Sequence, residues 1–131
     1  RRAAPKASEL WLLAVEHGGA VLLHPPEARG LLAGLWRWPT RPVAPEAPEG
    51  PVPRSLEARA FPGWTQVYTH RRERVRPLHL HVKRRPPLPE GMAWVPLERL
   101  AELPMGKRDA RLRELLRGPG ERPLSLPLDL L

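Results

Sequence analysis

The stretch Arg29-Gly30-Leu31-Leu32-Ala33-Gly34-Leu35-Trp36-Arg37-Trp38-Pro39 holds two glycines, three leucines and two tryptophans within eleven residues. Glycine adopts left-handed backbone conformations that other residues avoid, so Gly30 and Gly34 favour a tight loop. Leucine and tryptophan side chains are usually buried in folded proteins. The core is therefore expected to contain Leu31, Leu32, Leu35, Trp36 and Trp38.

The length and composition of the chain limit the classes of protein to consider. Its 131 residues fit one compact domain. The absence of cysteine excludes a disulfide, a cysteine-ligated zinc ion and an iron-sulfur cluster within the chain. No apolar run approaches the ~20 residues of a membrane helix, so no membrane association is expected. The Arg1-Arg2 start lacks both a methionine and a signal-peptide core, which suggests a cut within a longer protein.

The chain is strongly basic. It has 22 Lys and Arg against 14 Asp and Glu, a net charge of +8. Such a balance favours polyanionic partners, with nucleic acid first among them, although an arginine-rich protein can also be basic simply because it is well solvated. Nineteen prolines and the absence of Asn, Cys and Ile suggest a GC-rich, thermophilic source.

The pattern of apolar residues predicts three regions. Residues 1–8 are basic, have no apolar period and are expected to be a linker stub. Residues 9–117 form the domain, and residues 118–131 are a tail of Pro-Leu pairs that is either disordered or packed across the sheet. The domain opens with a β-hairpin, because two apolar runs, 9–16 and 20–24, flank the turn-forming pair Gly18-Gly19.

Further elements follow from the same reasoning. Residues 63–70 and 75–82 are predicted to be extended and paired, with Arg71 to Arg74 in or near their connection. Leu78, Leu80 and Val82 alternate with His79 and His81, so one face of that strand is apolar. The remaining predictions are a short helix over 54–60, a short strand over 93–95, and a helix over 107–117 that ends at Gly118-Pro119.

The glycine-rich stretch and a second motif, Tyr68-Thr69-His70, together resemble the C-terminal domain of MutY-type adenine DNA glycosylases. The family pattern runs Gly-Leu-Leu-x-Gly-Leu-Trp-x-aromatic-Pro and then aromatic-Ser/Thr-His, and the resemblance extends over residues 9–117. This chain departs from the family pattern at Arg37, where the family often has Glu. The resemblance implies an α+β Nudix-like fold, a mixed β-sheet with one or two flanking helices. It also implies a domain that recognises 8-oxoguanine and has no catalytic residues of its own.

The same resemblance implies partners and a cellular setting. The partners are double-stranded DNA containing 8-oxoguanine opposite adenine, and an N-terminal glycosylase domain that carries catalysis and an iron-sulfur cluster. No cofactor is expected in this chain itself. The expected location is the bacterial cytoplasm, in association with the nucleoid.

The resemblance also assigns roles to the second motif. Thr69 takes the position of the hydroxyl residue that bonds the Hoogsteen side of 8-oxoguanine, where oxidation has turned N7 from an acceptor into a donor. His70 would contact phosphate or brace the loop, and Tyr68 would pack behind it or against sugar. Arg71 and Arg72 are placed to meet the DNA backbone, with plain solvated charge as the alternative.

Other basic residues are weaker candidates for DNA contact. Arg29 precedes the glycine loop and faces either DNA or solvent. Lys83, Arg84 and Arg85 form a basic turn before two prolines, which is typical of a phosphate contact or of a solvated loop tip.

Two alternative functions stay open at this stage. A Nudix hydrolase needs a helix with Arg-Glu-x-x-Glu-Glu, whose carboxylates hold Mg²⁺ against a pyrophosphate. This interval offers instead Glu46 and Glu49 in a proline-rich segment and Glu57 alone, so metal-dependent hydrolysis is disfavoured. His79-x-His81 has a spacing that can bind zinc, but no third ligand lies nearby in sequence, so no metal site is predicted. The other alternative is a general nucleic-acid-binding module, which the charge supports but no aromatic array does.

Overall fold

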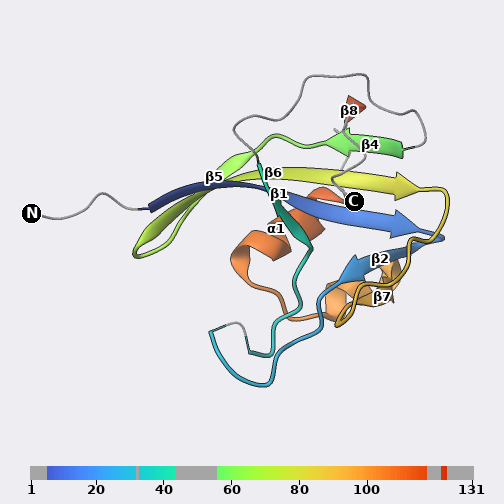
Figure 1. The fold of residues 1–131 in the computed structure, drawn as a ribbon, viewed down its shortest axis with the longest axis horizontal. Helices are drawn as coiled ribbons and strands as arrows, with labels where there is room; N and C mark the ends of the chain where they lie inside the picture. The colour runs from blue at the N-terminus through green and yellow to red at the C-terminus, as the bar shows by residue number, and fades with distance from the viewer. Residues whose placement is uncertain (1–5, 32, 44–55, 118–121, 124–131) are drawn as a thin grey trace, which may run out of the picture.

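The computed structural model describes residues 6–31, 33–43, 56–117 and 122–123, and within them one mixed sheet is the centre of the fold (Figure 1). Its strands follow the order β7-β2-β1-β6-β4-β8, with β3 paired to β1 and β5 paired to β6. The strands are β1 (Lys6–His17), β2 (Ala20–Leu23), β3 (Thr40–Pro42), β4 (Leu56–Ala60), β5 (Trp64–Val67), β6 (Arg71–Val82), β7 (Ala93–Pro96) and β8 (Arg122–Pro123). The helices are the 3₁₀ helix η1 (Leu97–Glu102) and the α-helix α1 (Lys107–Leu115).

Strands β1 and β6 run parallel to each other through the middle of the sheet. Their register extends from Lys6 opposite Arg71 to Glu16 opposite His81. Both faces of β1 are buried, since consecutive residues Leu12 and Leu13 are 0% and 2% exposed. A strand buried on both faces has a continuous apolar run instead of an alternating one, which explains the run of residues 10–15.

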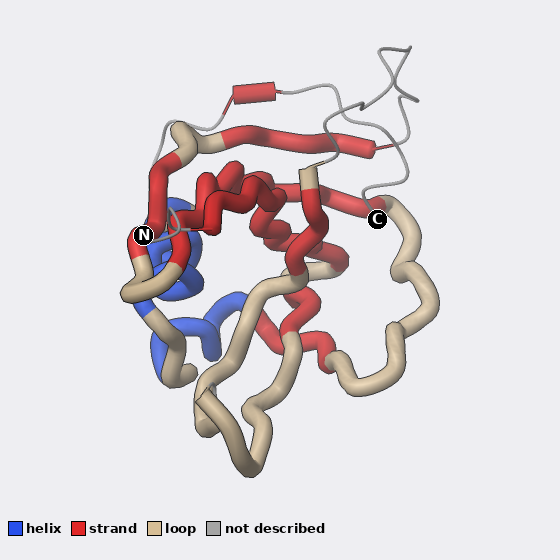
Figure 2. The backbone as a smooth tube through the Cα atoms, turned by 60° about the vertical axis from the view of Figure 1, so that its left-hand side comes forward, coloured by secondary structure: helices blue, strands red, loops and turns tan. Residues whose placement is uncertain are grey.

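The apolar residues form two layers, one on each face of the sheet. One layer lies beneath η1 and α1 and includes Trp38, Val75 and Leu112. The second layer, on the opposite face, includes Leu13, Leu78, Leu80 and Ala58. Figure 2 shows the helices gathered on one side of the sheet. The helix-bearing face is also the one that carries the candidate site described below.

Several predicted elements are confirmed. The N-terminal hairpin is formed by β1 and β2, and the left-handed Gly18 and Gly19 make its turn. Strands β5 and β6 pair, as predicted, and they run antiparallel, although β5 pairs with residues 72–75 of β6 and not with its later residues. Strand β7 and helix α1 lie where the sequence placed them, with Arg111 and Glu114 exposed on the outer side of the helix.

Three local predictions are wrong. The segment expected to be a short helix over 54–60 ends in strand β4, where the buried Ala58 pairs with Leu80. Tertiary pairing with a central strand overrides the weak helical preference of so short a segment. Strand β6 begins at Arg71 and not at residue 75, so Arg71 to Arg74 lie next to the connection but not in it. Strand β1 begins at Lys6, so residues 6–8 belong to the sheet instead of to a linker.

The glycine-rich stretch is only partly buried. Trp38 is 1% exposed and Trp36 packs against the core, but Leu31 is 99% exposed, contrary to expectation. Predictions for residues 1–5, Leu32, residues 44–55, and the tail apart from β8 lie outside the described residues, and these include Glu46 and Glu49. None of the described helices has the length and apolar character needed to cross a membrane.

Candidate functional site

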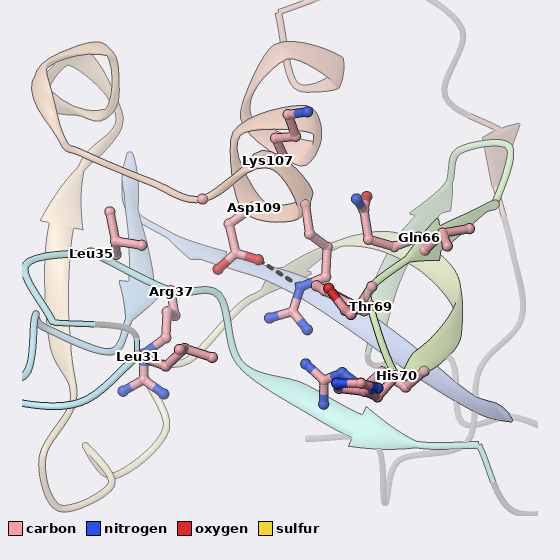
Figure 3. Close-up of a pocket in the computed structure, with 13 residues that line it drawn as sticks. Leu31, Leu35, Arg37, Gln66, Thr69, His70, Lys107 and Asp109 are labelled. Atoms are coloured by element: carbon pink, nitrogen blue, oxygen red, sulfur yellow. Dashed lines mark hydrogen bonds and ion pairs between the residues drawn. The ribbon is translucent and has the colours of Figure 1, made fainter. Parts of the chain in front are cut away.

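A pocket of about 870 Å³ opens where three segments meet: the loop between β2 and β3, the turn between β5 and β6, and the start of α1. Figure 3 shows these segments surrounding the cavity. The loop supplies Leu31, Leu35 and Arg37, and the helix supplies residues 106–109. The hairpin supplies residues 66–71, among them the Tyr68-Thr69-His70 motif.

The loop is shaped by its two glycines. Gly30 and Gly34 have φ of +100° and +77°, values that residues with a side chain rarely adopt. The amide of Gly34 donates to the carbonyl of Glu27, and the amide of Trp36 donates to the carbonyl of Pro104. The second bond joins the loop to the chain just before α1. The loop is therefore fixed at its base while the side chain of Leu31 extends fully into solvent at the pocket rim.

The β5–β6 turn presents the motif residues to the pocket. The amide of Tyr68 donates to the carbonyl of Arg71 at 2.8 Å, which closes the turn around Thr69 and His70. The guanidinium of Arg71 lies over the Tyr68 ring, 4.3 Å from its centroid. A cation over an aromatic face is attracted by the ring quadrupole, so this contact restrains both side chains. Thr69 and His70 are exposed at the tip of the turn.

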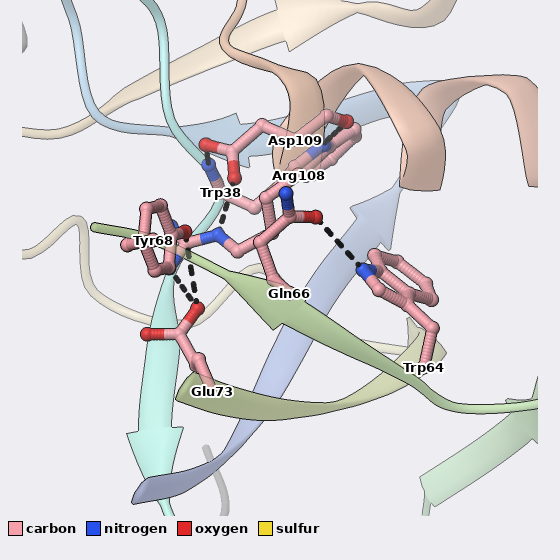
Figure 4. Close-up of polar contacts among 7 residues, drawn as sticks. All are labelled: Trp38, Trp64, Gln66, Tyr68, Glu73, Arg108 and Asp109. Atoms are coloured by element: carbon pink, nitrogen blue, oxygen red, sulfur yellow. Dashed lines mark hydrogen bonds and ion pairs between the residues drawn. The ribbon is translucent and has the colours of Figure 1, made fainter. Parts of the chain in front are cut away.

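A buried polar network beneath the pocket ties the three segments together (Figure 4). Arg108 donates to Glu73 at 3.0 Å and to the adjacent Asp109 at 2.8 Å. Asp109 accepts from the Trp38 backbone amide, and its carbonyl accepts from the Trp38 indole at 2.9 Å. The Tyr68 hydroxyl donates to Glu73 at 3.5 Å. Because Glu73 and Asp109 are each 4% exposed, these bonds are required to compensate for burying their charges.

The network also shifts the pKa values of two of its side chains, Tyr68 and Arg108. Burial raises the pKa of the Tyr68 hydroxyl, and the negative charge of Glu73 raises it further. Burial lowers the pKa of Arg108, but its bonds and charge contacts with Asp109 and Glu73 outweigh that effect, and the net shift is upward. The Tyr68 hydroxyl and the Arg108 guanidinium thus stay protonated and keep their donor roles.

The pocket wall carries an excess of positive charge. Arg108 is balanced by Glu73 and Asp109, and Arg37 is paired with Glu27 at 3.2 Å. Within the described part of the chain, neither Arg71 nor Lys107 forms an ion pair. Helix α1 also begins at this wall, and its N-cap residue Gly106 has no side chain to satisfy the first-turn amides. Free amides and the helix dipole favour an anion at such a position.

The structure brings together only some of the site residues predicted from the sequence. Tyr68, Thr69, His70 and Arg71 line the pocket, whereas Arg72 and Arg29 are exposed outside its lining. The basic turn Lys83 to Arg85 follows the far end of β6, which places it at the opposite end of the sheet. Its Arg85 lies over the Trp94 ring at 5.0 Å.

Sequence reasoning missed several pocket and supporting residues. In the sequence, Arg37 stands out only as a departure from the family pattern, and Lys107 only as the start of a helix. Glu73, Arg108 and Asp109 gave no signal, because 35 residues separate Glu73 from Arg108 and nothing in their local sequence indicates burial. The two buried carboxylates here are engaged by Arg108, so they do not form an open oxygen cluster for Mg²⁺.

A family model described as a NUDIX domain matches residues 10–115, and the chain therefore belongs to the Nudix family. Its α+β Nudix-like fold, predicted from the sequence, is confirmed by solved structures. A Nudix hydrolase from Nitrosomonas europaea is similar with a TM-score of 0.62, 15% identity and 96% of each chain covered. The E. coli ORF135 protein has a TM-score of 0.57 at 19% identity, with 86% of this chain and 90% of that chain covered.

The C-terminal domain of mouse MUTYH, solved in complex with human PCNA, is also similar in structure. Its TM-score is 0.54, with 19% identity and 93% of each chain covered. At these identities the likeness establishes the fold alone. Comparison with curated protein sequences gives no match.

Proposed function

We propose that this chain is the lesion-recognition domain of a MutY-type adenine DNA glycosylase, which binds 8-oxoguanine opposite adenine in double-stranded DNA. The observation that carries the proposal is the meeting of both resemblance motifs in one pocket: the loop after Arg29 and the Tyr68-Thr69-His70 turn. These motifs are thirty residues apart in sequence, yet both line the same cavity.

The chemistry of the pocket supports this role. Thr69 offers a small hydroxyl that both donates and accepts, and the altered Hoogsteen edge of 8-oxoguanine adds an N–H donor at N7. Arg71, Lys107 and the start of α1 line the same pocket and give it positive charge suited to the adjacent phosphates. The exposed Leu31 and Val67 provide apolar surface on the pocket rim.

The proposed division of labour leaves catalysis to another domain. Removal of the mispaired adenine would belong to an N-terminal glycosylase domain, which would also hold the iron-sulfur cluster. The domain described here would supply lesion recognition, with Thr69 as the base-reading residue and Arg71 and Lys107 as phosphate contacts. Arg29, Arg72 and the Lys83 to Arg85 turn stay as further predicted contacts.

An NMR titration tests where DNA binds. The ¹⁵N-labelled chain is titrated with two duplexes that differ only in carrying 8-oxoguanine or guanine opposite adenine. We expect the largest amide shift changes at Thr69, His70 and Lys107, and larger changes with the lesion duplex. Changes confined to residues outside the pocket, identical for the two duplexes, would contradict the proposal and leave a general nucleic-acid-binding module.

The second candidate function is hydrolysis of nucleoside diphosphate derivatives, which family membership and the similarity to Nudix hydrolases favour. The absence of Arg-Glu-x-x-Glu-Glu in the sequence argues against it, as does the engagement of Glu73 and Asp109 by Arg108. We expect no Mg²⁺-dependent turnover of 8-oxo-dGTP or of dinucleotides. Turnover that EDTA stops and that Glu57→Gln or Glu73→Gln abolishes would make the chain a hydrolase.

A further inference from the structure

We propose that Glu16, His79 and His81 form a binding site for a divalent transition metal ion, with Zn²⁺ as the best match. This site is separate from the pocket described above. One carboxylate oxygen and one ring nitrogen from each histidine all lie within 4.8 Å of one another.

The three side chains already face each other. His79 Nε2 lies 2.8 Å from Glu16 Oε1, and His81 Nδ1 lies 3.7 Å from Glu16 Oε2. The centroids of the two imidazole rings are 4.4 Å apart. Tetrahedral zinc with ligand bonds near 2.0 to 2.1 Å needs its ligand atoms about 3.3 Å apart. Both pairs therefore differ from this spacing by only a few tenths of an ångström.

The ligand set selects the metal. Imidazole nitrogens suit zinc and related first-row ions, whereas Mg²⁺ prefers oxygen ligands in octahedral geometry. Two histidines and one glutamate also provide three protein ligands, which leaves a fourth zinc position for water. That position is accessible, because the His81 side chain is 39% exposed while those of His79 and Glu16 are 10% and 15% exposed.

The parallel pairing of β1 and β6 creates this arrangement. His79 and His81 are two residues apart on β6, so they point to the same face of the sheet. In the register, Glu16 lies opposite His81, and the small Ala14 lies opposite His79. Glu16 is 63 residues from His79 in sequence, which is why the third ligand was not found from the sequence.

A neighbouring positive charge sets a limit on affinity. Arg59 on β4 is the register partner of His79, and its guanidinium opposes a dication through Coulomb repulsion. The negative charge of Glu16, in direct contact with both imidazoles, offsets this repulsion.

A bound ion would hold β1 and β6 together at the end of β6 far from Arg71. Ten residues of strand separate Arg71 from His81, roughly 33 Å. The proposed metal site is therefore remote from the Tyr68-Thr69-His70 turn, where we propose that the lesion binds.

Isothermal titration of the tag-free chain with ZnCl₂ tests the proposal, together with thermal unfolding with and without the metal. We expect one ion per chain and a Tm raised on the order of 5 to 10 °C at zinc concentrations well above Kd. Millimolar MgCl₂ should leave Tm unchanged. His81→Gln and Glu16→Gln should each weaken zinc binding at least tenfold, whereas His70→Gln, an exposed histidine outside the cluster, should not.

Two results would overturn the proposal. One is a wild-type Kd for zinc above about 100 µM. The other is unchanged affinity in His81→Gln and Glu16→Gln when far-UV circular dichroism shows that both variants fold. His81 is the more exposed histidine, so its variant stays informative even if His79→Gln fails to fold.

Discussion

At the scale of single residues, the proposed function depends on an exposed threonine held by buried charges. Thr69 lies at the tip of a turn whose neighbours are restrained: Tyr68 by Arg71 and Glu73, and Glu73 in turn by Arg108. A small hydroxyl discriminates between bases only when its position is fixed, since a mobile group adapts to either base. Under the proposed function, the network beneath the pocket would supply this restraint.

Thr69→Ala tests this role. We expect it to reduce the preference for the 8-oxoguanine duplex over the guanine duplex by about 1 to 3 kcal/mol, the scale of a specific base contact. Arg71→Ala should lower the affinity for both duplexes by the same factor, because a phosphate contact carries no base information. Thr65→Ala, an exposed threonine on β5 outside the pocket, is the matched control. An unchanged preference in folded Thr69→Ala would show that this hydroxyl does not read the base.

Tyr68 is the single tyrosine of the chain, so its titration can be followed directly by ultraviolet absorbance. Burial and Glu73 raise its pKa, so its midpoint should lie above the ordinary value of about 10. A raised folded pKa means that the unfolded chain loses this proton first. The stability linked to Tyr68 is therefore present below pH about 10 and is lost as pH rises through the folded pKa.

Glu73→Gln should lower the Tyr68 midpoint, because it removes the nearby negative charge. A midpoint at or below about 10 in the folded wild-type chain would contradict the buried contact between these residues.

The residue-scale predictions from sequence were uneven. Tyr68, Thr69 and His70 could be identified because their motif is local. Glu73 and Asp109 could not, because a carboxylate in an arginine-rich segment gives no sign of burial until β6 and α1 are packed together. Leu31 was placed in the core by its type, yet the loop presents it to solvent.

At the scale of elements, the β5–β6 hairpin and helix α1 determine the shape of the site. The chain lies close to β6 at Gly63, just before β5, where an added Cβ would lie 2.7 Å from the carbonyl oxygen of Val75. The helix begins at Gly106, where an added Cβ would lie 3.8 Å from a Leu35 methyl group, an ordinary contact. The two glycines differ, then, in how much space surrounds them.

Gly63→Ala should destabilise the chain by about 1 to 3 kcal/mol, because backbone must move to relieve the overlap. Gly106→Ala should cost less than about 1 kcal/mol, since only an N-cap preference is lost. Urea denaturation of both variants measures the difference. Equal stabilities would mean that the hairpin adjusts freely at Gly63.

Elements with a strong internal signal were predicted well. The Gly18-Gly19 turn and the alternation along β6 each specify their structure locally. Strand β4 was mistaken for a helix because its five residues acquire their conformation from pairing with β6, a partner about twenty residues away. Such a long-range contact leaves no periodic pattern in a short segment.

At the scale of the whole molecule, the net charge of +8 and the basic pocket wall predict electrostatic DNA binding. Two or three phosphate contacts imply a slope of roughly −2 to −3 when log affinity is plotted against log salt. Lys107→Ala should reduce the magnitude of that slope by about one, whereas Arg99→Ala, exposed on η1, should leave it unchanged. A DNA affinity that does not change with salt concentration would contradict the proposed phosphate contacts.

The most direct test of the central claim compares the affinity of the wild-type chain for two duplexes at one salt concentration. The duplexes carry 8-oxoguanine or guanine opposite adenine and are otherwise identical, and binding is followed by NMR titration so that weak affinities can be measured. We expect tighter binding of the lesion duplex by about 5- to 150-fold, the equivalent of about 1 to 3 kcal/mol. Equal affinities would contradict lesion recognition by this pocket.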